Sequence, residues 1–470
     1  KMSLRDVTFV VEDGSLGNSG STGTGVHVKI GASPVETTVP ILITGSMKPE
    51  QMKEKLGLSP LADACIDSVE NGASRIYCVP VRPETAGTNG EVAHSGTGGG
   101  TVSVSGTPNN AYDIILKITE DGPPNTAAFC CSVNGGYSYE AEETIPLSGK
   151  KELAGTGITL TFAEEFKAGD TYRFSTTAPA VSNSAVLKAV ESLYNSDLDF
   201  EFIHVVGTSA KALWASLAAS AELFLSLYKR PVFFLCEARN KGAEESLDEY
   251  TAALKAEAKG IDSYYVQVCS AWSQYTRWDG REQCINNAGI VAGLYGIAGV
   301  AQSIGRVDTF SISEAKMTRL MPEGIEDHIS ELDDAGYLTW RKYYGIDGCY
   351  VNNARVLCRE GSDYRYAEHV RVLNKMIREI YKQAVNMVQM DISASDDMET
   401  DINNILETLN IPLEDMAEAG ELSSGSVSIE DLEHVNILQD ERLDLVISFV
   451  PRGYVREFRF SLAMENPYRN

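Results

Sequence analysis

Two adjacent cysteines, Cys130 and Cys131, are the first residues of this chain that suggest metal or thiol chemistry. Together with His94 or His204 they would supply ligands for zinc or the nucleophile of a thiol enzyme. They lie in AAFCCSV, a run typical of a strand, in which neighbouring side chains point to opposite faces. No cysteine and histidine have the spacing of a zinc finger or ribbon. We therefore expect buried thiols here and no metal site.

Four acidic residues close together would be able to collect a cation: Asp396, Asp397, Glu399 and Asp401. The run lacks the glycine and the terminal glutamate of a calcium loop. Acidic residues in a first helical turn interact favourably with the helix dipole. We therefore expect a solvated helix start at this place.

The glycine-rich stretch GSLGNSGSTGTG, residues 14–25, has the composition of a phosphate-binding loop. Such loops join a strand to a helix, whereas this one has no lysine and leads into another strand, VHVKIG. It is therefore interpreted as a flexible tether. The chain also has no GxSxG or HExxH motif, and its six histidines are isolated. We expect a protein without catalytic residues, cofactor or metal, and hence not an enzyme.

The totals bound the class of protein. A chain of 470 residues makes three or four units of ordinary domain size. With 40 basic and 66 acidic side chains the net charge is -26, which argues against nucleic acid and membrane partners because both attract positive surfaces. The nine scattered cysteines, without CxxC spacing, indicate a reducing compartment. The apolar stretch Ala288 to Ile304 is short for a membrane span, and its glycines favour a buried, closely packed helix.

Two parts of the chain alternate apolar strands with amphipathic helices. The first part has VHVKIG, VPILITG, a helix over residues 48–71, and SRIYCVPV. The second has DFEFIHVVG, PVFFLCEAR and SYYVQVCSAW, separated by helices. Strands that are apolar on both faces indicate a parallel sheet covered on two sides. We expect a single α/β body built from both parts.

A stretch of different composition interrupts the body, from about Gly90 to Pro179. It contains short alternating runs (TVSVSG, AYDIILKI, AAFCCSV, GITLTF and DTYRFST) between linker-like ends. The spacing of the turns predicts an antiparallel β-sandwich, inserted into the body.

Near the C-terminus we expect a long helix over residues 366–389, an acidic block from Asp391 to Asp444 with a Gly/Ser turn in ELSSGSVSIEDLE, and two final strands. The last strand has Phe458, Phe460 and Leu462 on one face. It needs a partner. It can pair with the preceding run, Leu443 to Phe449, as a hairpin, or complete a sheet in a neighbouring molecule.

The arrangement resembles the contractile tail sheath proteins of bacteriophages and of phage-derived injection particles. Four stretches carry this likeness: MKPEQMKEKLGLSPLADACIDSVENGASRIYCVPV, the inserted β runs, YYGIDGCYVNNARVLCREGSDYRYAEHVRVLNKMIREIY, and the ending RLDLVISFVPRGYVREFRFSLAM. One departure is HVRVLNK, where Arg371 stands alone and many sheaths have an Arg-Arg pair before the long helix.

The resemblance implies a multidomain α/β protein with an inserted antiparallel β-sandwich and an α+β C-terminal assembly domain with extended terminal arms. Its parts are an N-terminal arm (1–25), the body (26–89 and 180–345), an outward-facing β module (90–179) and the assembly domain (346–470). Strand exchange between subunits is expected at Val7, Phe9, Val11, Tyr454, Phe458, Phe460 and Leu462.

The function implied is that of a structural subunit that polymerises helically, in stacked hexameric rings, around a tail tube and contracts to drive the tube through a cell envelope. The implied partners are copies of itself, the tail tube protein, and baseplate and tail terminator proteins, with neither nucleic acid nor membrane bound. The location implied is a phage tail or tail-like particle that is assembled in the bacterial host cytoplasm.

Two alternatives stay open. One is a cytosolic α/β enzyme with a β accessory domain and a cleft at the carboxyl ends of the strands, near Val206 to Thr208 or Glu237 to Arg239. The other is a different virion tail component.

Overall fold

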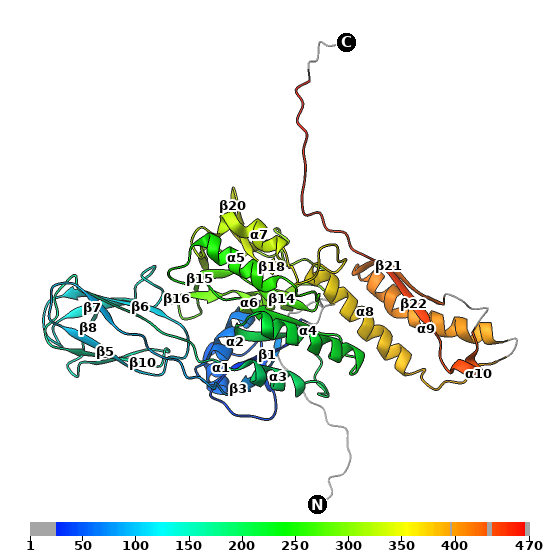
Figure 1. Cartoon of the computed structure of the whole chain (residues 1–470), viewed down its shortest axis with the longest axis horizontal. Helices are drawn as coiled ribbons and strands as arrows, with labels where there is room; N and C mark the ends of the chain where they lie inside the picture. Colours follow the sequence, from blue (N-terminus) through cyan, green and yellow to red (C-terminus); the bar gives the residue numbers. More distant parts are fainter. Residues whose placement is uncertain (1–24, 395–396, 430–434, 466–470) are drawn as a thin grey trace, which may run out of the picture. The chain divides into compact units, whose positions relative to one another are not determined.

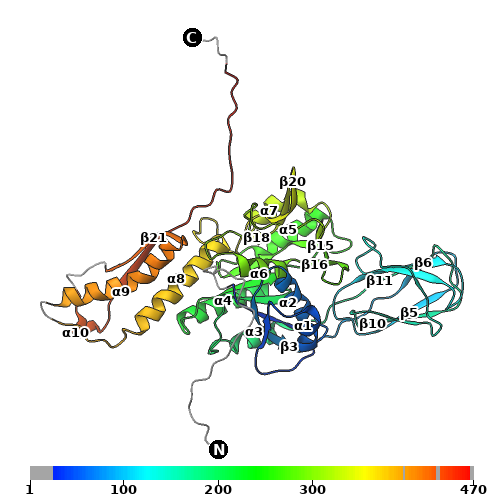
Figure 2. The same ribbon diagram turned by 180° about the vertical axis from the view of Figure 1, so that it is seen from behind.

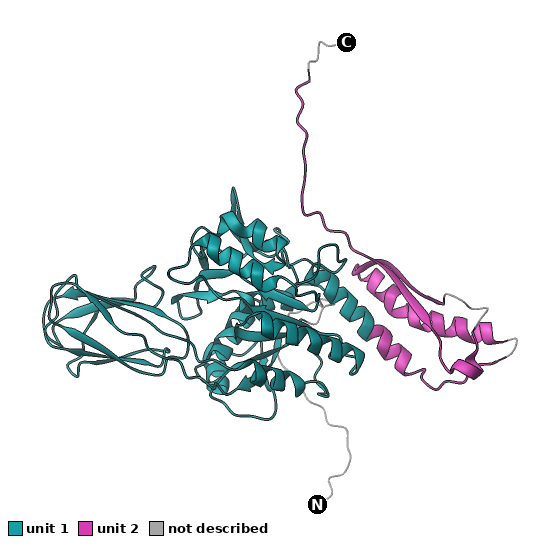
Figure 3. Cartoon of the chain, in the orientation of Figure 1, with its two compact units in different colours: residues 1–378 teal, residues 379–470 magenta. Residues whose placement is uncertain are grey.

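The computed structural model describes residues 25–394, 397–429 and 435–465. The chain is a mixed α/β protein with several sheets (Figure 1). It divides into two compact units, residues 1–378 and 379–470 (Figure 3). This division lies inside helix α8 (Ala367–Val385). The domain boundaries expected from the sequence stay predictions.

A seven-stranded sheet forms the centre of the first unit. Its strand order is β18-β14-β13-β12-β1-β3-β2, with every neighbouring pair parallel except β3 and β2. The strands are β1 (His27–Ala32), β2 (Ile41–Thr44), β3 (Arg75–Val81), β12 (Phe202–Thr208), β13 (Phe233–Glu237), β14 (Val266–Cys269) and β18 (Tyr337–Leu338). Strands β1, β13 and β14 are buried throughout, as apolar residues on both faces predict.

Helices cover both faces of this sheet. Helices α2 and α6 contact β1, β12 and β13 on one face, while α3 and α4 contact β1, β3, β13 and β14 on the other. The helices of the first unit are α1 (Pro49–Leu56), α2 (Pro60–Glu70), α3 (Asn183–Glu191), α4 (Lys211–Ser226), α5 (Leu247–Ala258), α6 (Ala288–Ile297), the 3₁₀ helix η1 (Ile325–His328), α7 (Ile329–Asp334) and most of α8. The sheet and its helices bury a large apolar core, and α1 and α2 bury a second, smaller cluster against β2 and β3.

The single helix expected over residues 48–71 is wrong, because two helices form there. Gly57 ends α1 with φ +69°, a left-handed value that glycine adopts without strain. Pro60 then starts α2, and the Ser59 hydroxyl accepts a hydrogen bond from the Ala62 amide as its N-cap.

Helix α6 is buried and closely packed, as expected for the stretch that begins at Ala288. A Cβ atom added at Gly293 would lie 2.6 Å from the Ser68 carbonyl oxygen, and one at Gly296 would lie 2.8 Å from the Cα of Ala73. The small residues therefore let α6 approach the backbone around α2. Among the described residues, the helices are all too short or too polar to cross a membrane.

Strands β4 to β11 group together away from the seven-stranded sheet (Figures 1 and 2). They form two antiparallel sheets, β5-β10-β9 and β4-β11-β6-β7-β8, which share one apolar cluster. The strands are β4 (Ala93–Ser95), β5 (Thr101–Gly106), β6 (Asp113–Glu120), β7 (Ala128–Ser132), β8 (Glu143–Thr144), β9 (Lys150–Leu153), β10 (Ile158–Ala163) and β11 (Thr171–Ser175). The chain enters and leaves this region side by side, since the Ala180 amide donates to the Thr85 carbonyl at 2.9 Å.

Smaller sheets complete the first unit. One has the order β16-β15-β17 and the other pairs β19 with β20. Their strands are β15 (Trp272–Thr276), β16 (Glu282–Asn286), β17 (Met317–Met321), β19 (Trp340–Tyr343) and β20 (Ile346–Val351).

The second unit contains the end of α8, α9 (Met398–Glu418), the short α10 (Ile437–Asp440) and a two-stranded antiparallel sheet. The strands of this sheet are β21 (Leu422–Ile429) and β22 (Leu445–Pro451). The Gly/Ser turn expected in ELSSGSVSIEDLE is wrong, because most of it is β21. Strand β21 forms because Leu422 and Val427 pack under α9 and the Asn410 side chain accepts a hydrogen bond from the Val427 amide at 2.7 Å.

Candidate assembly interface

The segment that follows β22, residues 452–465, is an extended stretch of the second unit without helix or strand (Figure 3). We call it the C-terminal segment. Four of its large apolar side chains are almost fully exposed: Phe458 at 73%, Phe460 at 82%, Leu462 at 97% and Met464 at 102%. Exposed apolar side chains in such a row indicate a surface that another protein covers.

These four residues alternate with others, as in a strand with two different faces. The rings of Phe458 and Phe460 stack with their centroids 6.2 Å apart. Between them, Arg459 Nε donates to a carboxylate oxygen of Glu457 at 2.8 Å. The segment therefore already has an apolar row and a polar row before any partner strand is present.

The sheet beside the C-terminal segment has open edges. Strand β22 pairs with β21 alone, and neither outer edge of this pair carries a further strand in the described residues. On the β21 side the Asn410 side chain already binds the amide and carbonyl of Val427, so the β22 edge is the more open one. Helix α9 packs against β21, whereas Ile447 of β22 remains 38% exposed. An exposed strand edge presents unpaired N–H and C=O groups that can bind an additional strand.

Of the two pairings left open by the sequence, the hairpin is wrong. Residues 445–451 pair with β21, with Val427 opposite Ile447 and Gly425 opposite Phe449, and in the described residues no strand pairs with the other edge of β22. The C-terminal segment makes no strand pairing in the described part of the chain.

The structure brings four of the predicted site residues together. Tyr454, Phe458, Phe460 and Leu462 all lie in the C-terminal segment, where Tyr454 is half-buried and Arg456 lies over its ring at 5.4 Å. Val7, Phe9 and Val11 lie outside the described residues. Met464 was missed, although it continues the same period-2 alternation and the same period would have found it.

Charge differs between the C-terminal segment and the rest of the second unit. The segment has three arginines (452, 456 and 459) and two glutamates (457 and 465), hence a net charge of +1. Residues 391–444 contain sixteen acidic residues and one basic residue, Arg442. The C-terminal segment is therefore locally basic in a strongly acidic chain.

Arg371, the solitary arginine of HVRVLNK, lies inside the first unit and is 0% exposed. Its guanidinium forms two hydrogen bonds with the Glu201 carboxylate, one of them from Nη2 at 3.1 Å. Burial disfavours the charged form of Arg371, but the carboxylate of Glu201 outweighs it and raises the pKa of Arg371 above its usual value. No local pattern of residues indicates this pair, because 170 residues separate its members.

A cleft of about 460 Å³ lies at the carboxyl ends of β1, β12 and β13, where the enzyme alternative expects one. Val206 to Ser209, Glu237 and Arg277 line it, together with Asp63 and Asp67 of α2. Arg277 lies 3.6 Å from Asp63 and 3.4 Å from Asp67. Burial raises the pKa of Asp67 to about 6.

Glu237 connects the cleft to a buried polar chain. Lys29 Nζ lies 2.6 Å from Nδ1 of His204, and Nε2 of His204 lies 3.0 Å from the carboxylate of Glu237. Burial raises the pKa of Glu237 to about 7 and lowers that of Lys29. In this arrangement Lys29 donates to His204, which in turn donates to Glu237, so the groups satisfy one another inside the sheet.

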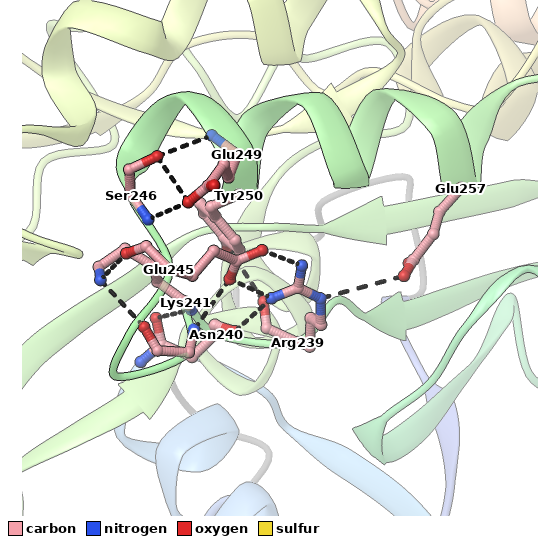
Figure 4. A network of polar contacts seen from close by, with 9 residues as sticks. Arg239, Asn240, Lys241, Glu245, Ser246, Glu249, Tyr250 and Glu257 are labelled. Atoms are coloured by element: carbon pink, nitrogen blue, oxygen red, sulfur yellow. Dashed lines mark hydrogen bonds and ion pairs between the residues drawn. The ribbon is translucent and has the colours of Figure 1, made fainter.

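Arg239, two residues after β13, belongs to a separate network (Figure 4). Its guanidinium binds both carboxylate oxygens of Glu245, at 2.6 and 2.7 Å, and lies over the ring of Tyr250. The Tyr250 hydroxyl donates to the Arg239 carbonyl at 3.0 Å. Ser246 caps α5 next to it. The network fastens the loop between β13 and α5 and explains Arg239 without a ligand.

Cys130 and Cys131 lie on opposite faces of β7, with Cys131 buried and Cys130 half-buried. Among the described residues no group of three or more histidine, cysteine or acidic side chains is placed to hold a metal ion. Glu399 and Asp401 lie in the first turn of α9, as expected for a helix start.

Solved structures of sheath proteins share this fold. The PVC sheath complex of an extracellular contractile injection system, in its contracted state, aligns with a TM-score of 0.55 at 11% identity over 100% of both chains. A chain of the contracted anti-feeding prophage baseplate aligns with a TM-score of 0.53 at 14% identity, also over 100% of both chains. The sheath tail protein of Desulfitobacterium hafniense aligns at 14% identity with a TM-score of 0.49, over 95% of this chain and 100% of its own. The alignments with the two contracted injection particles confirm the expected resemblance to sheath proteins at the level of fold.

No curated protein matches the chain. Two family models do, and together they cover almost all of it: the DUF2586 N-terminal domain matches residues 4–355 and the DUF2586 C-terminal domain matches residues 363–469. The chain therefore belongs to the DUF2586 family.

Proposed function

We propose that this protein is the structural subunit of a contractile tail sheath, which polymerises helically around a tail tube and contracts to drive the tube through a cell envelope. The observation that carries the proposal is the C-terminal segment, whose exposed apolar row lies next in the chain to a sheet with open edges. The fold shared with subunits of contractile injection particles supports the same function.

In this proposal the C-terminal segment of one subunit adds a strand to the β21–β22 sheet of a neighbour. Backbone hydrogen bonds at the open edge hold the added strand, and contacts of its alternate side chains fix how its residues align with those of the sheet. Burial of Phe458, Phe460 and Leu462 contributes about 2 kcal/mol for each side chain. Val7, Phe9 and Val11 are proposed to add a second strand in the same way.

Charge assists this exchange. The basic C-terminal segment of one copy meets the acidic second unit of another, so the encounter is favoured although whole subunits repel each other. Both effects are screened by salt, with a Debye length of about 10 Å at 0.1 M. Assembly is therefore expected to depend on ionic strength.

The parts of the chain take separate tasks in this proposal. Residues 1–25 and the C-terminal segment serve as arms, 26–89 and 180–345 form the body, and 346–470 form the assembly domain. Residues 90–179 are an inserted β-sandwich that faces outward. The subunits form stacked hexameric rings around a tail tube protein, between a baseplate and a tail terminator, in a virion or tail-like particle assembled in the host cytoplasm.

One observation favours a second candidate, an α/β enzyme. The cleft at the ends of β1 and β12 lies where the helix connections change from one face of the sheet to the other, a usual place for ligands in such sheets. The polar groups around it are satisfied mainly by one another, and Arg239 is held in its loop. A sheath function gives the exposed apolar row of the C-terminal segment a role in binding a neighbour, whereas an enzyme function gives this row no role.

Electron microscopy of the purified protein with and without residues 452–470 tests the proposal. The full chain is expected to form helical tubes. The truncated chain is expected to stay monomeric with an unchanged melting temperature, because the described side chains of the C-terminal segment are exposed in the isolated subunit, with Tyr454 half-buried. Normal tubes from the truncated chain would contradict strand exchange. Discrete oligomers of the full chain that a ligand stabilises would favour the enzyme.

A further inference from the structure

Two distant parts of the chain meet at one buried carboxylate, that of Glu201 just before β12. The amide of Gly25, where the described structure begins, donates to Glu201 Oε2 at 3.1 Å. Arg371, in the first turns of α8, binds the same carboxylate through Nε and Nη2. The backbone adds a further link, since the Glu201 amide donates to the Val26 carbonyl at 2.7 Å.

Arg371 also binds the end of α6. Its Nη2 donates to the carbonyls of Tyr295 at 3.3 Å and Ala298 at 3.2 Å, and its Nη1 donates to that of Gly299 at 3.3 Å. The last carbonyls of a helix lack partners within the helix and carry partial negative charge. The guanidinium therefore joins α6, α8 and Glu201 in one rigid cluster.

Gly25 fits tightly against the same helix. A Cβ atom at this position would lie 2.5 Å from the Cα of Gly296 and 2.6 Å from the Tyr295 carbonyl oxygen. Gly25, α6 and α8 are thus held together at one place, either by direct contact or through the side chains of Glu201 and Arg371.

Stability alone does not account for this pair. Glu201 and Arg371 are 1% and 0% exposed, and burying two charges costs several kcal/mol of desolvation, so apolar replacements of buried pairs are often neutral or stabilising. What the pair provides is a set of hydrogen bonds that join Gly25, α6 and α8 at one carboxylate and one guanidinium, an arrangement in which a pull on these segments would load the bonds in parallel. Bonds loaded in parallel must break together, whereas bonds at the end of a strand break one after another.

We infer that the Glu201–Arg371 pair is the mechanical junction of the first unit. It fixes Gly25 and the helix that leads to the second unit to one point, so tension between the two ends of the chain bypasses the seven-stranded sheet. Arg378 Nη1, which donates to the Pro231 carbonyl at 3.2 Å, ties α8 to the body a second time. The source of the tension, neighbouring subunits that pull on the two arms, rests on the proposed function; the junction itself does not.

Constant-force spectroscopy on single full-length chains, held by their two termini, tests the junction without any assembly. The variants are Arg371→Lys and Glu201→Gln. Arg371→Lys keeps the positive charge but loses the planar guanidinium that forms two hydrogen bonds with one carboxylate, and Glu201→Gln keeps the shape of the side chain but removes its negative charge. The matched control is Arg277→Lys, since Arg277 is also buried between acidic groups, Asp63 and Asp67, but contacts neither Gly25 nor α8 in the described structure.

We expect Arg371→Lys and Glu201→Gln to shorten the lifetime of the folded first unit under force at least tenfold, which corresponds to a barrier lowered by about 1.4 kcal/mol. Arg277→Lys is expected to lower the melting temperature while the lifetime under force changes less than twofold. Equal shortening by Arg277→Lys, or an unchanged lifetime in both junction variants, would overturn the inference. If Arg371→Lys does not fold, Glu201→Gln alone decides. Because single chains are pulled, failure of the junction is distinguishable from failure of the sheath function, which would show as absent tubes.

Discussion

The substitution Phe460→Ala separates folding from assembly most clearly. The Phe460 side chain is 82% exposed in the isolated subunit, so its removal deletes only the stacking contact with Phe458 in the same segment. The melting temperature of the monomer is therefore expected to stay within about 1 °C, since surface changes usually alter stability by less than 0.5 kcal/mol.

In the assembled state the same ring is expected to be buried against a neighbour. Losing a buried aromatic side chain removes about 2 kcal/mol of apolar burial at each contact. Because every 1.4 kcal/mol is a factor of ten in affinity, the critical concentration for tube formation is expected to rise roughly 30-fold. Sedimentation of assembled protein over a series of total concentrations measures this quantity.

The control lies five residues earlier in the same segment. Val455 is also apolar and 72% exposed, but it belongs to the opposite, polar row of the alternation. Val455→Ala is expected to raise the critical concentration less than threefold. Equal effects of the two substitutions would refute the face assignment, and a lowered melting temperature for Phe460→Ala without an assembly defect would refute the exchange of strands.

Two further results are expected. Replacement of residues 90–179 by a short linker should leave a folded body, although it removes the Arg281–Glu140 ion pair and the hydrogen bond between Asn110 and Asp63. Circular dichroism and thermal unfolding measure whether the shortened chain folds. Failure to fold would contradict the insertion boundaries. Glu237→Gln should change the pH dependence of stability. The pKa of Glu237 is raised to about 7, so the folded parent binds this proton more tightly than the unfolded chain and loses that contribution as pH rises from about 4.5 through 7. The variant cannot ionise at this position and does not lose this contribution. The free energy of unfolding of the variant minus that of the parent should therefore be larger at pH 8 than at pH 5, by about 3 kcal/mol at most. A difference between variant and parent that does not vary with pH would contradict the assignment.

The sequence predicted a parallel sheet covered on two sides because its signal is local, although it missed β18 and the antiparallel pairing of β2. Strands such as β13, with Phe233, Phe234 and Leu235 in succession, are apolar on both faces, and such runs are buried on both sides wherever they lie in the chain. The period-2 alternation of the C-terminal segment is also local, but the structure gives residues 452–465 no strand, so the final strand stays a prediction that concerns the assembled state. Both patterns can be identified without knowing which other parts of the chain pack against these segments.

Features that depend on distant partners were not predictable in this way. Strand β21 has serines at 423, 424, 426 and 428, which indicated a turn, and only contact with α9 makes it a strand. The pairing of Glu201 with Arg371 depends on how the sheet brings β12 and α8 together, and the Lys29–His204–Glu237 chain depends on the order of three parallel strands. The pattern of residue types along the chain does not show which distant helices and strands become neighbours, or how their residues align.

The backbone link between Thr85 and Ala180 has a consequence for engineering. Because the two ends of the β-rich region leave the body side by side, any domain with adjacent termini can be grafted at this point without stretching the scaffold. The same place therefore offers a display site at which each copy of the chain can carry one foreign polypeptide.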